Sequence, residues 1–150
     1  MQPKTIFAAD AAAPRSAAAA PSRQQRLPAL SSKLEYPASR EALEALLANQ
    51  AAIDVCGCDA FGLSALHKLA AWNASELLAI LLPHLPPEHI NAPGGDAGYT
   101  ALHHCVDMGS KDALALLLTC PHIDADRPDA KGRTPRALAA EMGTLELLFP

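Results

Sequence analysis

Aromatic residues are scarce in this sequence: phenylalanine, tyrosine and tryptophan make up 4% of its 150 residues, although half of the residues are hydrophobic. The core must therefore be built from leucine and alanine, which favour helices over the strands of a β-sandwich. No apolar run approaches the ~20 residues of a membrane-spanning helix. A secretory signal is not expected either, because Asp10, Pro14 and Arg15 interrupt the alanine-rich start.

Known catalytic patterns are also missing: the sequence has no G-x-S-x-G elbow, no G-x-x-x-x-G-K-[ST] loop and no H-E-x-x-H pair. Residue types that bind zinc do occur, at Cys56, Cys58, His67, His103, His104, Cys105, Cys120 and His122. They show no repeated C-x₂-C or H-x₃-H spacing, and without a secretory signal the four cysteines are expected to be reduced thiols. We therefore predict no catalytic residue, no cofactor and no metal site. The alternative is a metal- or redox-responsive protein that uses Cys56, Cys58 and nearby histidines.

Charge is distributed unevenly along the chain. Residues 1–34 contain five lysines and arginines against one acid, whereas residues 35–150 contain seven against fifteen aspartates and glutamates. Nucleic-acid binding requires clustered basic residues, so the acidic body is not expected to bind nucleic acid. Its charge favours a partner protein of basic character.

Residues 1–35 are rich in alanine, proline, serine and arginine and show almost no periodic apolar pattern. Such a segment cannot bury enough surface to offset its ordering entropy, so we predict a disordered tail. The alternative is a mitochondrial transit peptide, because the segment is basic and poor in acids. Prolines at 14, 21 and 28 would interrupt the amphipathic helix that a transit peptide needs.

The rest of the chain repeats. The glycines Gly62, Gly98 and Gly132 lie 36 and 34 residues apart, and each is followed two positions later by Ser64, Thr100 or Thr134. A second marker has the same period, because a hydroxyl residue precedes each leucine-rich segment at Ser39, Ser75, Ser110 and Thr144. Serine and threonine at such positions are typical helix N-caps. Two markers with one period indicate a repeat protein.

The segments GLSALHKLA (62–70), GYTALHHCV (98–106) and GRTPRALAA (132–140) resemble the Gly-x-Thr-Pro-Leu-His-x-Ala-Ala run of the ankyrin repeat. EALEALLANQAAID (41–54) resembles the second helix and exit of a preceding repeat. The resemblance implies an all-α, ankyrin-type helix-turn-helix solenoid of about 3.5 repeats with short β-turn fingers. The expected repeat domain, 36–150, divides into a degenerate repeat at 36–58, repeats at 59–94 and 95–128, and a truncated capping repeat at 129–150.

Each unit should bury one face of its helices against its neighbours. The expected core residues are Leu66, Leu69, Ala70, Leu78, Leu81 and Leu82 in one unit, and Leu102, Cys105, Leu114, Leu117 and Leu118 in the next. The resemblance also implies that Gly62, Ser64, His67, Gly98, Thr100, His103, Gly132 and Thr134 are structural repeat positions. The proline-rich link at 83–95 is expected to be extended.

Binding would then depend on outward positions. Trp72, Met108 and Met142 occupy one repeat position, implied to lie at the concave end of each first helix, with Asp107 and Glu141 as an acidic margin. Leu63, Tyr99 and Arg133 follow the turn glycines at the finger tips, and Lys68 and His104 are also expected to point outward. Trp72 either contacts a partner or fills a gap between fingers and helices, whereas Phe61, beside the finger tip, is expected to fill such a gap.

These features together predict a non-catalytic adaptor or regulatory subunit that binds another protein on its concave face and finger tips. An intracellular, most simply cytoplasmic, location is expected, with nucleus and mitochondrion left open. No membrane contact is expected. Self-association is a further expectation, because Leu145, Leu147, Leu148 and Phe149 end the chain with little to cover them.

Overall fold

The computed structural model describes residues 27–149. Its helices are α3 (Leu30–Lys33), α4 (Arg40–Leu47), η2 (Gln50–Ala52), α5 (Ala65–Ala71), α6 (Ser75–Leu81), η3 (Leu82–His84), α7 (Pro87–Ile90), α8 (Ala101–Met108), α9 (Lys111–Leu118), α10 (Pro135–Glu141) and α11 (Leu145–Leu148). The transit-peptide alternative and most of the predicted tail lie outside the described residues.

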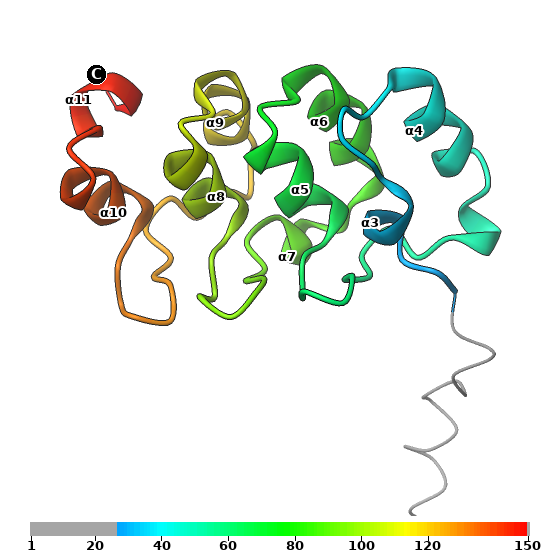
Figure 1. Cartoon of the computed structure of the whole chain (residues 1–150), viewed down its shortest axis with the longest axis horizontal. Helices are drawn as coiled ribbons and strands as arrows, with labels where there is room; N and C mark the ends of the chain where they lie inside the picture. Colours follow the sequence, from blue (N-terminus) through cyan, green and yellow to red (C-terminus); the bar gives the residue numbers. More distant parts are fainter. Residues whose placement is uncertain (1–26, 150) are drawn as a thin grey trace, which may run out of the picture.

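The helices form two parallel rows along the long axis of the molecule (Figure 1). In one row α5 contacts α8 and α8 contacts α10; in the other α4 contacts α6 and α6 contacts α9. The loops that precede α5, α8 and α10 all project to the same side of the stack (Figure 1). The predicted all-α helix-turn-helix solenoid is therefore confirmed. Within residues 27–149, bridges between extended segments are isolated ones, such as Cys58 with Ser64 and Gly94 with Tyr99.

The core consists mainly of leucines that recur at helical spacing along both rows. Seven of them, in α5, α6, α8 and α9, are at most 1% exposed: Leu66, Leu69, Leu78, Leu81, Leu102, Leu114 and Leu117. Burial of one leucine side chain contributes about 1.5–3 kcal/mol. The core prediction was wrong at Leu118, which is 37% exposed. Successive residues of an α-helix are rotated by about 100° around the helix axis, so the residue after buried Leu117 faces away from the core.

Of the four predicted N-caps, only Ser39 caps its helix, by accepting a hydrogen bond from the Ala42 N–H at 3.1 Å. Ser75 is the first residue of α6, and the cap position belongs to Ala74. The other two hydroxyls turn to carbonyl groups instead. Ser110 donates to the Ala71 carbonyl at 3.0 Å and Thr144 to the Ala139 carbonyl at 3.4 Å. Each of these two hydroxyls therefore satisfies a carbonyl group of a first helix. The pattern of residues around Ser110 and Thr144 does not reveal these bonds.

The folded part of the chain begins before residue 36, which corrects the predicted tail boundary. Leu30 and Ser31 in α3 are fully buried, and Leu34 is 6% exposed. Backbone hydrogen bonds join this segment to the end of the first unit, from Leu30 N to Asp54 O (2.8 Å) and from Asp54 N to Pro28 O (2.9 Å). Four helical residues are too few to show a periodic pattern, so only their contact with α5 reveals them.

The link between the second and third units is not extended, contrary to prediction. It contains the short helices η3 and α7, and Ile90 at the end of α7 is only 7% exposed. Pro87 is the first residue of α7. Proline is tolerated there because the first helical N–H has no partner within the helix, so a proline can start a helical turn as well as break one.

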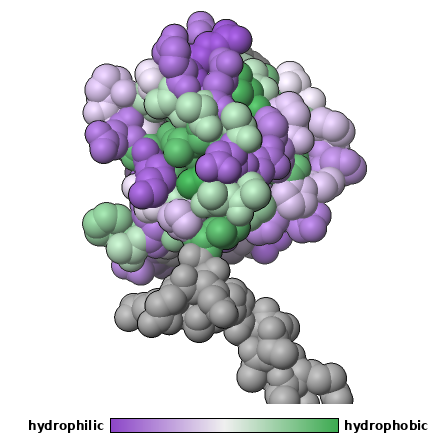
Figure 2. Space-filling view, turned by 90° about the vertical axis from the view of Figure 1, so that its right-hand side faces the viewer, coloured by the Kyte–Doolittle hydropathy of each residue, from purple (hydrophilic) through white to green (hydrophobic). Residues whose placement is uncertain are grey.

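Within residues 27–149, no further unit packs against either end of the stack. Figure 2 looks onto the end that α3 and α4 form, where hydrophobic patches lie between hydrophilic residues. Leu46 of α4 is only half-buried. At the opposite end, Leu147 of α11 is 63% exposed.

Candidate functional site

Two of the three fingers, those of Gly62 and Gly132, are shaped by an aspartate that stands three residues before the turn glycine, whereas the finger of Gly98 has Gly95 at that position. Asp59 Oδ1 accepts hydrogen bonds from the backbone N–H groups of Phe61 (2.9 Å) and Leu63 (3.1 Å). Asp129 Oδ1 does the same for Lys131 (2.8 Å) and Arg133 (2.9 Å). Sequence reasoning assigned these aspartates no role, although the shared spacing Asp-x-x-Gly was visible.

The carboxylates of both aspartates are held ionised. Burial alone would raise the pKa of Asp59, but the ammonium of Lys68 and the two backbone N–H groups lower it below its usual range. The pKa of Asp129 is lowered in the same way, by the backbone and guanidinium of Arg133 and by the Lys131 N–H, against the effect of burial. The finger turns are therefore stabilised by charge at neutral pH.

His67 joins α5 to the link that leads to the next finger, and His103 joins α8 to the finger of the following unit. His67 Nδ1 accepts from the Ser64 N–H at 3.1 Å, while His67 Nε2 lies 2.8 Å from the Ala92 carbonyl oxygen. His103 bonds in the same way to Thr100 (3.1 Å) and, through Nε2, to the Arg133 carbonyl (2.7 Å). These partners require a neutral ring with its proton on Nε2. Burial lowers the pKa of both histidines, which favours that neutral form.

The fingers also bond to one another directly. The Gly95 N–H donates to the Gly62 carbonyl and the Ala130 N–H to the Ala97 carbonyl, each at 3.0 Å. Gly62 has a φ of 77°, and a Cβ there would lie 3.2 Å from the Gly95 nitrogen. Glycine is thus required both by the turn and by the close approach of the next finger.

Lys68 and His104 do not point outward as predicted. The Lys68 ammonium lies 2.9 Å from Asp59 Oδ2 and donates to the Ser31 carbonyl at 2.6 Å. The His104 ring lies between the rings of His67 (5.3 Å) and Tyr99 (5.4 Å, centroid distances). In the part of the chain that the structure describes, His104 Nε2 is buried without a hydrogen-bond partner. Burial, together with the nearby His67 and His103, lowers the pKa of His104 to about 4.

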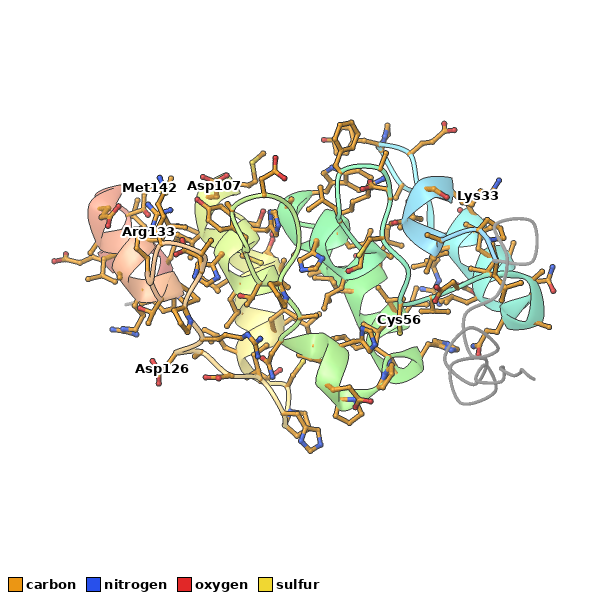
Figure 3. The ribbon with its side chains drawn as sticks, turned by 90° about the horizontal axis from the view of Figure 1, so that it is seen from below. Lys33, Cys56, Asp107, Asp126, Arg133 and Met142 are labelled. Atoms are coloured by element: carbon orange, nitrogen blue, oxygen red, sulfur yellow. The ribbon has the colours of Figure 1, made fainter. Side chains whose placement is uncertain are left out.

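The row of first-helix ends lies along one edge of the stack. Met108 is 61% and Met142 43% exposed, whereas Trp72 is half-buried. Asp107 and Glu141 are exposed beside these methionines. Seen from the finger side, Asp107 and Met142 lie along one edge of the molecule and Asp126 along the other (Figure 3).

A pocket opens between the ends of α5 and α8. Tyr36, Trp72, Asn73, Met108 and Ser110 are among its walls, and its volume is about 650 Å³. Tyr36 is 71% exposed and meets Trp72 edge-on, with 5.5 Å between ring centroids. Sequence reasoning missed Tyr36 because no repeat pattern covers it. We call this feature the Trp72 pocket.

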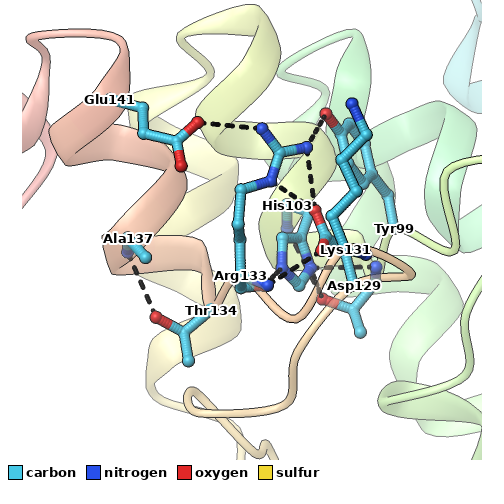
Figure 4. A network of polar contacts seen from close by, with 9 residues as sticks. Tyr99, His103, Asp129, Lys131, Arg133, Thr134, Ala137 and Glu141 are labelled. Carbon is cyan, nitrogen blue, oxygen red and sulfur yellow. Dashed lines mark hydrogen bonds and ion pairs between the residues drawn. The ribbon is translucent and has the colours of Figure 1, made fainter.

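Arg133 organises the last finger (Figure 4). Its guanidinium donates to Asp129 Oδ2 (3.0 Å), to Glu141 Oε1 (3.0 Å) and to the Tyr99 hydroxyl (3.3 Å). Tyr99 in turn stacks on His103, with ring centroids 5.4 Å apart and planes 15° apart. Three residues predicted as separate contacts, Tyr99, Arg133 and Glu141, therefore form one connected network.

The remaining finger residues differ in exposure. Leu63 is half-buried. Phe61 is 77% exposed, so the expectation that it fills a gap between finger and helix is wrong. The side chain projects from the finger surface instead, where it is available for contact.

None of the four cysteines, all of which lie in the described residues, forms a disulfide bond. Burial and then Asp54 raise the pKa of Cys56, burial and then Asp59 raise that of Cys58, and burial raises that of Cys105 to about 12. Thiols with raised pKa are mostly protonated at neutral pH, and the thiol form is the less reactive one. Among residues 27–149, no group of three or more His, Cys, Asp or Glu side chains is placed to hold a metal ion.

The family description "Ankyrin repeats (3 copies)" matches residues 34–129. The chain belongs to the ankyrin-repeat family. Ankyrin repeats are generally protein–protein interaction modules and are typically not enzymes. No curated protein matches this ankyrin-repeat chain. In its described residues, no helix has both the length and the apolar character to cross a bilayer.

Proposed function

We propose that this ankyrin-repeat protein is a non-catalytic adaptor or regulatory subunit, and that the edge carrying Trp72, Met108 and Met142 binds its partner. The observation that carries the proposal is the exposure of two methionines in a row on this edge. Isolated apolar residues are common on surfaces, whereas exposed apolar residues that recur at one repeat position offer a single partner several contacts along the stack. Methionine is flexible and polarisable, which suits it to adaptable contacts.

The finger tips extend the same surface. Tyr99 and Arg133 are held in place by the network around Asp129, so a partner would not have to order them. Tyrosine and arginine are enriched among residues that contribute most to protein interfaces. Lys68 and His104, by contrast, are held inside the stack and are withdrawn as contact residues.

Charge supports a partner of basic character. Asp107 and Glu141 are exposed beside the methionine row, and acids outnumber bases fifteen to seven over residues 35–150. Complementary charge chiefly raises association rate and specificity. Self-association through the C-terminal end stays a prediction, with Leu147 exposed there; light scattering across a dilution series tests it.

Affinity capture with the full chain tests the proposed function. The wild-type chain and its Met108→Ala/Met142→Ala variant are each used as bait, and captured proteins are quantified by mass spectrometry. We expect a defined set to be lost from the variant, because both side chains are exposed and their removal should leave folding intact. Asp126→Asn, on the opposite edge, serves as the control bait. Identical protein sets from all three baits would contradict the proposal.

A further inference from the structure

The Trp72 pocket is built on turns that the next unit holds in place. Asn73, which follows Trp72, accepts a hydrogen bond from the Ala113 N–H at 3.0 Å through its side-chain oxygen. Ser110 donates to the Ala71 carbonyl at 3.0 Å. Both bonds connect the end of α5 to the start of α9, so the part of the wall that Ala71, Asn73 and Ser110 form is fixed before any ligand arrives. Binding to a preformed surface avoids the entropic cost of ordering it.

The pocket combines the exposed ring of Tyr36 and the half-buried ring of Trp72, and carboxylates stand next in sequence to two of its wall residues. Tyr36 and Trp72 stand at an interplanar angle of 63°, so they present ring surfaces in different directions. Glu35 precedes Tyr36 and Asp107 precedes Met108, and both acids are exposed. Ring faces attract cations, and an exposed carboxylate next in sequence to a wall residue offers a charge-assisted partner. This combination selects a cation with a flat or apolar surface.

We propose that the Trp72 pocket receives an arginine side chain from a linear segment of the partner, with the guanidinium against the aromatic rings and paired with Asp107. This inference rests on the proposed function and specifies the partner's chemistry. Arginine fits better than lysine because its planar guanidinium stacks on aromatic rings while still donating to a carboxylate. Exposed Met108 accommodates an aliphatic neighbour of the arginine. A volume of about 650 Å³ is sufficient for both side chains.

The chain contains one tryptophan, so its fluorescence reports on this pocket directly. A library of random 12-residue peptides is selected against the full chain. The most enriched peptide is then synthesised twice, once with arginine and once with citrulline, which keeps the shape and removes the charge. Binding is followed by Trp72 emission and by anisotropy of a labelled peptide. We expect enriched peptides to contain arginine beside an aliphatic residue, and the emission of Trp72 to change on binding.

Variants then test whether Tyr36 and Asp107 contact the arginine of the peptide. Asp107→Asn is expected to lower the affinity for the arginine peptide about fivefold, as is usual for the loss of an exposed ion pair. Tyr36→Ala is expected to lower it about tenfold, as is usual for the loss of an aromatic interface contact. Asp126→Asn removes the same charge from the opposite edge and should leave affinity unchanged. In the Asp107→Asn background, replacing arginine by citrulline should cost less than in the wild type, because the shared ion pair is already lost.

The failure of this inference is distinguishable from failure of the proposed function. Selected peptides without arginine, or binding that Tyr36→Ala and Asp107→Asn leave unchanged, would overturn the arginine pocket. So would the absence of any selected peptide. The proposed function would survive each of these results if protein capture still depends on Met108 and Met142. Thermal melting of Tyr36→Ala verifies that a lost affinity does not reflect unfolding.

Discussion

The unit at residues 95–128 and the unit at 129–149 share a turn glycine and a capped first helix, but they differ in how they are packed. In the former, α8 lies between α5 and α10, and α9 has eight residues. In the latter, α10 has a first-helix neighbour on one side only, and α11 has four residues. The same local pattern thus gives a core in one place and a partly exposed edge in the other.

The histidine position shows the difference most directly. His103 reaches the Arg133 carbonyl of the following finger. Its equivalent in the last unit, Ala137, is exposed and makes no such link. Arg136 stands where the preceding unit has the buried Leu102, and its guanidinium lies 4.8 Å from the centre of the Phe149 ring. Among the described residues no finger follows this unit, so its first helix has fewer inward-facing contacts than α8.

The largest expected effect is a difference in the free energy of unfolding between substitutions in α9 and in α11, the second helices of the two units. Leu117→Ala in α9 should lower the free energy of unfolding by about 3 kcal/mol, because it leaves a cavity at a fully buried position. Leu147→Ala in α11 should change it by less than about 0.5 kcal/mol, since that side chain is 63% exposed. Urea unfolding followed by circular dichroism measures both. Equal losses would show that the terminal helix is packed as tightly as the inner one.

The second effect depends on pH. The pKa of His104 is lowered to about 4 from an ordinary 6.5, so the folded state keeps the ring neutral while the unfolded chain takes up a proton. Stability is therefore complete above pH 6.5 and falls as pH drops towards 4, with about 2 kcal/mol lost from this group by pH 5. His104→Leu, which copies Leu138 of the last unit, should lose correspondingly less between pH 7.5 and pH 5.

Urea unfolding at the two pH values measures this difference. Some pH dependence should persist in His104→Leu, because the pKa values of His67 and His103 are lowered as well. His122→Gln, at an exposed position, is the matched control and should keep the wild-type profile. A variant His104→Leu that loses as much stability as the wild type would show that His104 is not the group responsible.

The smallest effect distinguishes the two hydroxyls that turn to carbonyl groups. Ser110→Ala should cost about 1 kcal/mol, because the hydroxyl is buried and its bond to Ala71 joins two units. Thr144→Ala should cost less than about 0.5 kcal/mol, since its bond is longer and only partly buried. Thermal melting of the two variants, compared with the wild type, resolves the order. A reversed order would mean that the last unit depends more on its hydroxyl than the inner one.

Much of the fold could be read from spacing because turn glycines and helical periodicity are local properties. Most of the residues whose environment was not predicted share one cause, which is contact with a distant segment. Leu30 is buried by α5, and Ser110 bonds to a helix of the preceding unit, so neither is visible within its own segment. His104 is the exception, because Leu138 at the equivalent position already indicated an inward-facing site.

The residues of the candidate site also divide into those that the repeat pattern predicted and those that depend on contacts between segments. Met108, Met142 and Asp107 were found from the repeat frame, and all three are exposed. Tyr36 was missed because it precedes the first helix of clear periodicity and meets Trp72 only through the stacking of segments. The bonds of Arg133 to Tyr99 and Glu141 likewise depend on where separate units come together.

The sequence by itself determined the period, the turn glycines and the two main helices of each repeat, because each follows from backbone geometry and side-chain preference over a few residues. Only the tertiary structure decided which polar side chains are withdrawn from the surface and which aromatic rings form a pocket. Those outcomes depend on residues that are 30 or more positions apart in the chain, as with Lys68 and Ser31 or Trp72 and Tyr36. Lateral stacking brings such residues together, and no local pattern encodes the resulting neighbours.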